Sequence, residues 1–418
     1  MAAGSTPPYV VIGGGQAGFW AADTLRKADP DRECILLAAE PLPPHERPPL
    51  SKGYLLGRQS RDSLLFRAPD FYAAAGIDLR LSCPATAIDP DARTVTLADG
   101  TRLSYQAAMI ATGARLRRLS VPGADLTGIH YLRSVTDADS LGQALRAAGR
   151  VAVIGGGFIG MEVAAAAREL GCAVTVVEAE PRIMNRGAPA EISDAIAALH
   201  AAKGVTILTG RRVTGFAGDR AVAAVELDGH AALPCDLAVV GIGIQPETGL
   251  AEAAGIACRD GILVDAWGRT SAEAVFAAGD VARREDPGSG LSLRQEAFQN
   301  AQGQAVAAAK TMAGQPTPYL ETPWLWSDQY DENVQIAGIP AADDRLILRG
   351  DPAARAFTVL HLRSGRLVAA SVINTIREMR ACRRLIEAGL RVPEDATEAE
   401  LADPEVRLLD LTRRLKGR

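Results

Sequence analysis

The chain has 418 residues, of which 48% are hydrophobic, and a formal net charge of −5. This length allows two or three domains with sizeable cores, and an acidic chain without a basic tail has no electrostatic footprint for nucleic acid. No apolar run reaches the roughly 18 residues of a membrane helix and the start of the chain is unlike a signal peptide, so we expect a cytoplasmic protein that binds neither membranes nor nucleic acid.

Six cysteines are spread along the chain, and no two of them lie within four residues of each other. This spacing offers neither a Cys-x-x-Cys redox pair nor a zinc-binding pattern. We therefore predict no metal site.

The first predicted unit is a βαβ element at residues 10–40. A β-branched run leads into Gly13, Gly15 and Gly18, an alanine-rich helix follows, and a second strand ends near Glu40. Glu40 follows Gly18 by 22 residues (40 − 18), close to the spacing of about 20 expected for an acid that binds a ribose. The glycines permit a tight turn and close approach to a pyrophosphate, and the helix N-terminus attracts phosphate charge. The pattern predicts a dinucleotide site.

A proline-rich segment, residues 41–52, comes next and carries Arg47 and Lys52. Proline fixes φ and disfavours a helix. Such a stiff loop could hold the two cations in place, or it could be a rigid connector with two solvated side chains, and the residues alone leave both readings open.

A helix near residues 69–75 and a hairpin turn at 98–101 follow. The apolar strand that begins at Met109 then ends in a turn of small residues, 112–114, where backbone can approach a ligand closely. We place a domain boundary near residue 116.

A second βαβ unit at residues 151–178 repeats the first. It contains Gly155, Gly157 and Gly160, a helix that ends near Gly171, and Glu178, which lies 18 residues beyond Gly160 (178 − 160). A lone Gly-x-Gly-x-x-Gly is weak evidence, but chance would have to produce the whole context twice. The chain is therefore predicted to bind two dinucleotides.

The chain is then expected to leave the second unit and return to the first domain. Residues 236–246 repeat the strand-and-turn pattern of 109–114, and a strand from residue 274 ends in Gly279-Asp280. Asp280 would lie at the carboxyl end of a strand, where α/β sheets bind ligands, or it could cap a following helix. A helix at residues 295–313 is expected to carry Glu296, Asn300 and Gln304 on one polar stripe.

A proline-rich linker leads to a third segment that opens with Trp324-Leu-Trp-Ser-Asp-Gln-Tyr330 and ends in helices. Arg377, Arg380 and Arg384 recur at i, i+3 and i+7 on one predicted helix face, with Arg383 adjacent. Such a stripe is usually only solvated, although it could dock a partner.

Together these motifs resemble the FAD-dependent, NADH-utilising ferredoxin reductases of bacterial oxygenase systems, of the putidaredoxin-reductase and rubredoxin-reductase type. The resemblance runs from Val10 to about Gly389. It implies an α/β fold with two Rossmann-like dinucleotide-binding domains, glutathione-reductase-like, plus a C-terminal α+β domain. The implied domains are an FAD-binding domain at 1–115 and 244–320, an NAD-binding domain at 116–243, and the C-terminal domain at 321–418.

The resemblance also implies the cofactors FAD and NADH and the residues that contact them. In chain order these are Gly13, Gly15, Gln16, Ala17, Gly18, Glu40, Arg47, Lys52, Ala111, Thr112, Gly113, Gly155, Gly157, Phe158, Ile159, Gly160, Glu162, Glu178, Gly243, Gly279, Asp280 and Trp326.

Catalytic roles are implied for Lys52, Glu162 and Trp326. By resemblance, Lys52 lies near the reactive edge of the flavin and Glu162 faces it from the nicotinamide side. The Lys52 cation near the flavin would stabilise the negative charge that the reduced flavin ring gains. Trp326 would pack close to the flavin, with Trp324 beside it, as a shield or on the route by which electrons leave.

The residues near Glu178 favour NADH over NADPH. A 2′-phosphate would meet Glu178 and Glu180, like charge against like charge, and Arg182 is the close cation. The sequence departs from the family pattern at His45, where a tyrosine is usual, and at Glu247, where an asparagine is common.

The implied activity is transfer of electrons from NADH through FAD to a [2Fe-2S] ferredoxin that supplies a cytochrome P450 or another oxygenase, by a monomer or weak homodimer. The arginine stripe would attract an acidic ferredoxin. The alternatives are an apoptosis-inducing-factor-like flavoprotein, an NADH oxidase, and a disulfide reductase, which would need a cysteine that the 41–52 segment lacks.

Overall fold

This computed structural model describes residues 6–285, 290, 292–389, 396–408 and 410. The chain forms two compact units. Unit 1 consists of Met1–Pro48, Ser60–Arg115 and Ile244–Glu321, and unit 2 of Pro49–Gln59, Leu116–Gly243 and Thr322–Arg418. The three-domain division made from the sequence stays a prediction.

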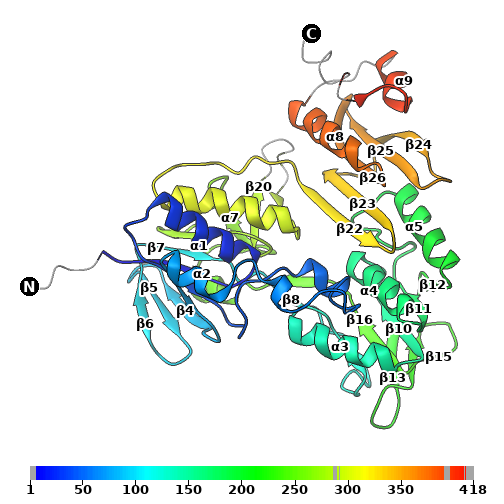
Figure 1. Ribbon diagram of the computed structural model, residues 1–418, viewed down its shortest axis with the longest axis horizontal. Coiled ribbons are helices and arrows are strands. Elements are labelled where there is room, and N and C mark those ends of the chain that lie inside the picture. Colours follow the sequence, from blue (N-terminus) through cyan, green and yellow to red (C-terminus); the bar gives the residue numbers. More distant parts are fainter. Residues whose placement is uncertain (1–5, 286–289, 291, 390–395, 409, 411–418) are drawn as a thin grey trace, which may run out of the picture. The chain divides into compact units, whose positions relative to one another are not determined.

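Unit 1 is built on a parallel sheet (Figure 1). Its strand order is β19 (Val275–Ala277), β7 (Ala107–Ile110), β1 (Tyr9–Ile12), β2 (Cys34–Leu37) and β3 (Ile77–Arg80). Strand β1 is buried on both faces, as expected for a central parallel strand.

Alternate residues of β1 point to opposite faces and join different cores. Tyr9 and Val11 pack with α1 (Gln16–Ala28) and α7 (Phe298–Met312), whose many alanines let the helices lie close to the sheet. Val10 and Ile12 pack instead toward an antiparallel sheet. This second sheet consists of β4 (Ala85–Asp89), β5 (Thr94–Leu97) and β6 (Arg102–Ser104).

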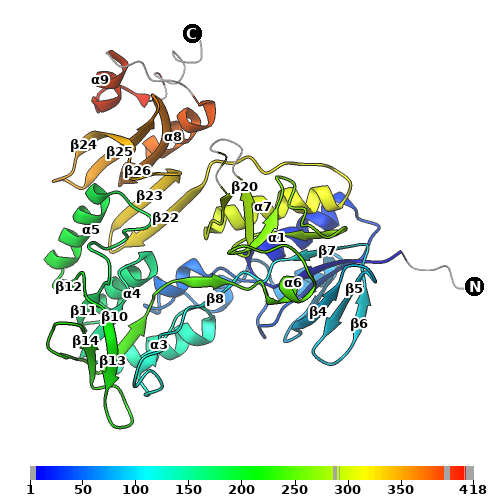
Figure 2. The same cartoon turned by 180° about the vertical axis from the view of Figure 1, so that it is seen from behind.

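Short elements complete unit 1. Helix α6 (Gly249–Ala253) contacts β4 (Figure 2). The others are η2 (Asp62–Leu64), α2 (Pro69–Ala74), β8 (Ala114–Leu116), β17 (Ile244–Pro246), β18 (Ile262–Val264), β20 (Ala282–Glu285) and β21 (Ser292–Leu293).

Unit 2 contains a second parallel sheet. Its order is β12 (Thr206–Leu208), β11 (Ala173–Val177), β10 (Arg150–Ile154), β16 (Leu237–Val240) and β9 (Ile129–His130). Around it lie α3 (Val135–Ala147), α4 (Phe158–Glu169), α5 (Ala190–Ala202), β13 (Val213–Ala217), β14 (Ala224–Leu227) and β15 (Leu233–Pro234).

An antiparallel sheet from the C-terminal segment belongs to the same unit. Its order is β22 (Trp324–Gln329), β23 (Glu332–Gly338), β26 (Arg366–Ile373), β25 (Ala356–Arg363) and β24 (Arg345–Asp351), followed by α8 (Ile376–Ala388) and α9 (Ala396–Ala402). Ile336 and Phe357 of this sheet share one core with Met161 of α4 and Ile196 of α5. This shared core places β22 against α4.

The predicted fold class is confirmed, with corrections at two sites in unit 1. Asp280 is followed by the strand β20, so the reading of Asp280 as a helix cap is wrong. Helix α7 begins after Glu296, and Asn300 and Gln304 are buried, so the predicted polar stripe is wrong as well. No helix in the described ranges is long and apolar enough to cross a membrane.

Candidate functional site

The first glycine-rich loop is shaped by the backbone of unit 1. Gly13 has φ +124°, and a Cβ there would lie 2.2 Å from the carbonyl oxygen of Ala111, while a Cβ on Gly18 would lie 1.7 Å from that of Gly13. Gly15 differs, because no described atom lies within 4 Å of its Cβ position. The outer glycines are thus required by the fold, and the middle glycine borders open space.

The second loop, in unit 2, has the same design. Gly155 has φ +104° and its Cβ would lie 2.4 Å from the carbonyl oxygen of Gly241, and a Cβ on Gly160 would lie 2.0 Å from that of Gly155. Gly157 again has nothing described within 4 Å. Phe158 and Ile159 form the first turn of α4, whose backbone N–H groups face this loop. Each loop therefore fits the pyrophosphate of a dinucleotide.

Other predicted residues of unit 1 meet at the same carboxyl edge of its sheet. Ala111, Thr112 and Gly113 follow β7, and Thr112 Oγ1 donates a hydrogen bond to the Glu247 carbonyl oxygen at 2.8 Å. Gly279 follows β19, and its N–H donates to Gln304 Oε1 at 3.0 Å.

The Ala17 side chain lies 2.9 Å from where a Cβ on Gly279 would be, so α1 approaches this turn closely. Asp280 follows directly. The structure thus brings the loop at 13–18, the turn at 111–113 and the turn at 279–280 together.

Several amide side chains of unit 1 have buried oxygen atoms without a hydrogen-bond partner among the described residues. A buried polar atom left unpaired is costly, so such a group of atoms indicates a polar ligand. Gln16 begins α1 and its amide nitrogen lies 3.4 Å from Gln302 of α7, which connects the two helix ends. The oxygens belong to Gln16, Gln295, Gln299 and Asn300. Gln295 and Gln299 were not predicted, and no local pattern in the sequence distinguishes them.

Glu40 lies three residues beyond β2 and pairs with Arg47. His45 Nε2 is 3.8 Å from the Glu40 carboxylate, and its Nδ1 lies 2.9 Å from the Pro43 carbonyl oxygen. Burial lowers the pKa of His45, which favours the neutral ring. His45 therefore packs within the predicted cofactor segment.

Glu178 lies directly after β11 and is fixed by backbone donors. Its Oε2 accepts from the N–H of Gly156 at 2.6 Å and its Oε1 from the N–H of Glu180 at 2.8 Å. The side chain of the nearby Arg182 forms hydrogen bonds with other groups. It donates to Ser193 Oγ at 2.6 Å and to the Ala188 carbonyl oxygen at 2.7 Å. Gly243, with φ +98°, follows β16, a strand of the same parallel sheet as β11.

The predicted catalytic residues Lys52 and Glu162 are in direct contact within unit 2. Glu162, in α4, is only 3% exposed, and its Oε1 lies 2.9 Å from Lys52 Nζ and accepts from Ser327 Oγ at 2.6 Å. Its Oε2 accepts from Ser51 Oγ. Ser51 ends the short 3₁₀ helix η1 (Pro48–Ser51) that precedes Lys52. Burying a carboxylate is costly unless such donors pair with it.

Ser51 and Ser327 were not predicted as site residues. They lie inside the two motifs that carry Lys52 and Trp326, so the motifs themselves were the available signal. Trp326 directly precedes Ser327 in β22. The Trp326 ring stacks on the Trp324 ring, with their centroids 5.7 Å apart. The guanidinium of Arg383 lies 5.7 Å from the Trp324 ring centroid.

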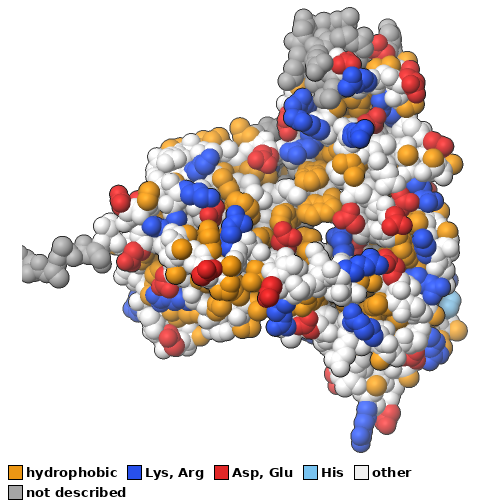
Figure 3. Space-filling view, viewed as in Figure 1, with side chains coloured by type: hydrophobic (Ala, Val, Ile, Leu, Met, Phe, Trp, Pro, Cys, Tyr) orange, Lys and Arg blue, Asp and Glu red, His pale blue; other side chains and the backbone are white. Residues whose placement is uncertain are grey.

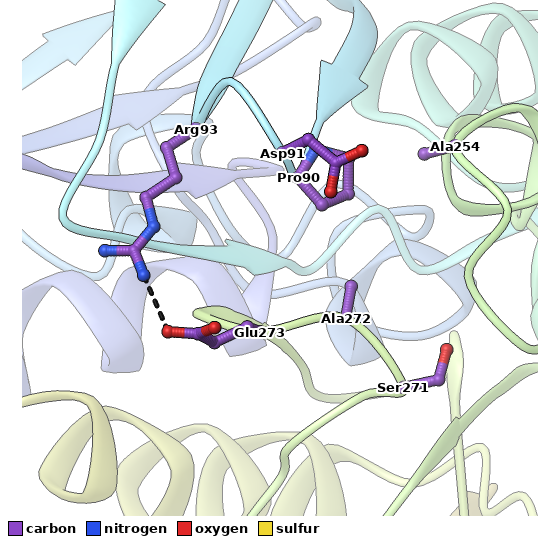
Figure 4. Close-up of a pocket in the computed structure, with 7 residues that line it drawn as sticks. All are labelled: Pro90, Asp91, Arg93, Ala254, Ser271, Ala272 and Glu273. Carbon is purple, nitrogen blue, oxygen red and sulfur yellow. Dashed lines mark hydrogen bonds and ion pairs between the residues drawn. The ribbon is translucent and has the colours of Figure 1, made fainter.

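A hollow of about 460 Å³ lies elsewhere on unit 1 (Figure 4). Arg93 and Glu273 form an ion pair of 2.7 Å at its rim, and both side chains are exposed. Its lining residues are Pro90, Asp91, Arg93, Ala254, Ser271, Ala272 and Glu273. The predicted site residues are not among them, so this hollow is separate from the glycine-rich loop.

Comparison with known proteins gives two matching families. Residues 7–305 match the family described as pyridine nucleotide-disulphide oxidoreductase, and residues 324–412 match the reductase C-terminal family. This chain belongs to the pyridine nucleotide-disulphide oxidoreductases. As a family member it is an oxidoreductase, and the ferredoxin-reductase type recognised from the sequence is confirmed.

Full-length relatives support this assignment. The ferredoxin–NAD(+) reductase component of the anthranilate 1,2-dioxygenase system of Burkholderia cepacia is 41% identical over 97% of this family member and 99% of the relative. The ferredoxin reductase for the CYP199A2 system of Rhodopseudomonas palustris has a TM-score of 0.94 and 36% identity, over 97% of this chain and 100% of that one. A covalent putidaredoxin reductase–putidaredoxin complex has a TM-score of 0.95 and 34% identity, over 99% and 100%.

Proposed function

We propose that this enzyme carries electrons from NADH through FAD to a [2Fe-2S] ferredoxin that supplies a cytochrome P450 or another oxygenase. The observation that carries the proposal is the pair of like-built glycine loops, each with a middle glycine that borders open space. Two relatives that match from end to end are reductases of a dioxygenase system and of a P450 system.

In this proposal FAD binds to unit 1 and NADH to unit 2, each along the carboxyl edge of its parallel sheet. When bound, the flavin takes an electron pair from the nicotinamide and releases the electrons singly. The FAD set contains Gly13, Gly15, Gln16, Ala17, Gly18, Glu40, Arg47, Ala111, Thr112, Gly113, Gly279 and Asp280, and the NADH set contains Gly155, Gly157, Phe158, Ile159, Gly160, Glu178 and Gly243.

Lys52 supplies a positioned cation in this scheme. Its ammonium group is held at 2.9 Å from the Glu162 carboxylate, which is itself fixed by the hydroxyls of Ser51 and Ser327. A cation already in place stabilises developing negative charge without reorganisation. Trp326, stacked on Trp324, serves as a shield for the reacting ring.

The geometry around Glu178 supports NADH as the reductant. The carboxylate is anchored by the backbone of Gly156 and Glu180, so it cannot turn away from a 2′-phosphate without losing both hydrogen bonds. Arg182 already donates to Ser193 and to backbone carbonyls. A 2′-phosphate would therefore meet the negative charge of Glu178, while Arg182 already binds other acceptors.

The test is steady-state reduction by the purified, flavin-loaded enzyme. A panel of [2Fe-2S] ferredoxins and rubredoxins is assayed with NADH and with NADPH. We expect at least one [2Fe-2S] ferredoxin to accelerate NADH consumption and to become reduced itself, with a much lower kcat/KM for NADPH. A colourless protein that does not take up flavin, or NADH consumption that no ferredoxin accelerates, would contradict the proposal.

The same assay separates the alternatives. Hydrogen peroxide formed in proportion to NADH consumed would identify an oxidase, and slow reduction accompanied by a change in association state would favour the apoptosis-inducing-factor-like reading. A disulfide reductase needs a reactive thiolate. Burial instead raises the thiol pKa of Cys34 and Cys382 to about 12 and that of Cys235 to about 11.

A further inference from the structure

A chain of buried hydrogen bonds runs from Glu162 away from Lys52 and ends at His200. Ser327 Oγ, which donates to Glu162, lies 3.2 Å from Gln329 Nε2, and Gln329 Oε1 lies 2.9 Å from His200 Nε2. Ser327 and Gln329 are two residues apart on β22 and so share a face, and His200 belongs to α5. His200 and Ser327 are 0% exposed and Gln329 is 1% exposed.

The chemistry of the groups gives this chain one direction. With the Gln329 amide in this orientation, Oε1 accepts from His200, which then carries its proton on Nε2, and Gln329 Nε2 donates to Ser327. The Ser327 hydroxyl is then left to donate to Glu162. Every donor therefore points toward the carboxylate.

The other neutral tautomer of His200 would reverse the direction of these hydrogen bonds. With the proton on Nδ1, Nε2 would accept, Gln329 would turn its amide, and the Ser327 hydroxyl would donate to Gln329 and leave Glu162. His200 Nδ1 is buried and has no partner among the described residues, and an unpaired acceptor there is less costly than an unpaired N–H. Burial also lowers the pKa of His200 to about 4, so the ring is neutral at pH 7.

We propose that His200 is a positioning residue for the Lys52–Glu162 pair and acts through Gln329 and Ser327. It orients the Ser327 hydroxyl, which holds the Glu162 carboxylate in its contact with Lys52. This inference rests on the proposed function only in assigning Lys52 and Glu162 to the reacting site.

The test measures the reactivity of the Lys52 amine in the purified full-length enzyme. Trace acetylation with acetic anhydride at a fixed pH is quantified at Lys52 by mass spectrometry. His200→Phe and Gln329→Met remove the chain without touching Glu162 or Lys52. We expect each to raise the labelling rate of Lys52 about threefold to tenfold, the factor that corresponds to one net hydrogen bond. Ser327→Ala should raise it at least as much.

Rescue and control variants separate positioning from general loosening of the core. In His200→Gln the side-chain amide can still donate to Gln329, so Lys52 labelling should return toward the wild-type rate. His361 is a matched control, because it is a buried histidine of unit 2 that takes no part in the hydrogen bonds from His200 to Glu162. Its Nε2 lies 3.4 Å from Ser371 Oγ. His361→Phe should leave Lys52 labelling unchanged.

Unchanged Lys52 labelling in folded Gln329→Met or Ser327→Ala would overturn the proposal, as would equal increases in His361→Phe and His200→Phe. Labelling requires neither a nucleotide nor a ferredoxin, so it can succeed or fail independently of ferredoxin reduction. If both proposals hold, His200→Phe lowers kcat with NADH while the KM for ferredoxin stays at the wild-type value.

Discussion

At the residue scale, the Glu162 carboxylate is a buried charge of unit 2 whose removal should lower stability. Glu162→Gln would place an amide N–H₂ or a neutral oxygen where the ammonium of Lys52 and two hydroxyls now find a charged acceptor. Breaking a buried ion pair costs about 3 to 5 kcal/mol. Because the Lys52 side chain is 20% exposed, we expect the free energy of unfolding in urea to fall by about 2 to 3 kcal/mol.

The matched control for this variant lies on the same helix. Glu169 of α4 pairs with Arg58, and the two side chains are 28% and 64% exposed. Glu169→Gln should change the free energy of unfolding by less than about 1 kcal/mol. Equal losses in the two variants would show that burial of the Glu162 pair has no special weight.

His200 predicts a pH dependence of stability. Its pKa is lowered from 6.5 to about 4 by burial in the folded protein, so between these values the unfolded chain binds the proton more readily. Stability is therefore lost as the pH falls from about 6.5 to about 4, by up to about 3 kcal/mol for this group. Tyr330 faces the ring at 5.1 Å and stays neutral, since burial raises its pKa to about 12.

Urea unfolding of the wild-type protein and His200→Gln at pH 7 and pH 4.5 measures this contribution. The variant should lose less stability than the wild type on acidification. Parallel pH profiles would contradict the assignment. The other buried histidines, such as His361, are present in both proteins and cancel in the comparison.

The sequence was informative about single residues only where a motif marked them. Lys52 and Glu162 were both named, and the structure places them 2.9 Å apart. Ser327 and His200 were missed because their contacts join residues 165 and 129 positions apart, Glu162 with Ser327 and His200 with Gln329. Those contacts depend on β22 packing against α4 and α5, which no local periodicity encodes.

At the element scale, the two glycine-rich loops allow one residue to be tested for binding and another for folding. Gly157 has φ −72°, and no described atom lies within 4 Å of its Cβ position, so alanine fits there. A Cβ on Gly160 would lie 2.0 Å from the carbonyl oxygen of Gly155. Gly157→Ala should fold normally and retain its flavin while the KM for NADH rises about tenfold or more, because the methyl group fills space that the pyrophosphate needs.

Gly160→Ala is the structural counterpart and should lower the melting temperature or prevent expression of folded protein. Circular dichroism melting curves and NADH titrations on both variants check this pair. An unchanged KM for NADH in Gly157→Ala would show that the second glycine-rich loop does not bind the nicotinamide nucleotide.

The sequence predicted helices and strands correctly where hydrophobic periodicity and glycine turns agree. It failed where packing between residues distant in the sequence decides the structure. The βαβ units were predicted because glycine turns separate a buried strand from an amphipathic helix. The strand β20 after Asp280 was missed, because a Gly-Asp turn precedes strands and helices equally well. The burial of Asn300 and Gln304 was missed for a related reason, since their helix packs its polar residues inward toward the Gly279 turn.

At the scale of the whole molecule, the exposed arginines of α8 predict how the enzyme meets its redox partner. Arg377, Arg380 and Arg384 are exposed, whereas Met379 and Cys382 on the other face of the helix are buried. Lys and Arg side chains gather over the region of α8 (Figure 3). Redox encounters are small and transient, so long-range attraction between this face and an acidic ferredoxin should govern their rate.

Reversing all three charges with Arg377→Glu, Arg380→Glu and Arg384→Glu should raise the KM for ferredoxin about tenfold at low salt and flatten its salt dependence, while ferricyanide reduction stays at the wild-type rate. The control reverses Arg212, Arg220 and Arg259, which are exposed outside α8, and changes the net charge equally. If attraction depended only on net charge, both triple variants would lose ferredoxin turnover to the same extent. A selective loss in the α8 variant would assign ferredoxin docking to this helix, and unchanged kinetics in both would exclude it.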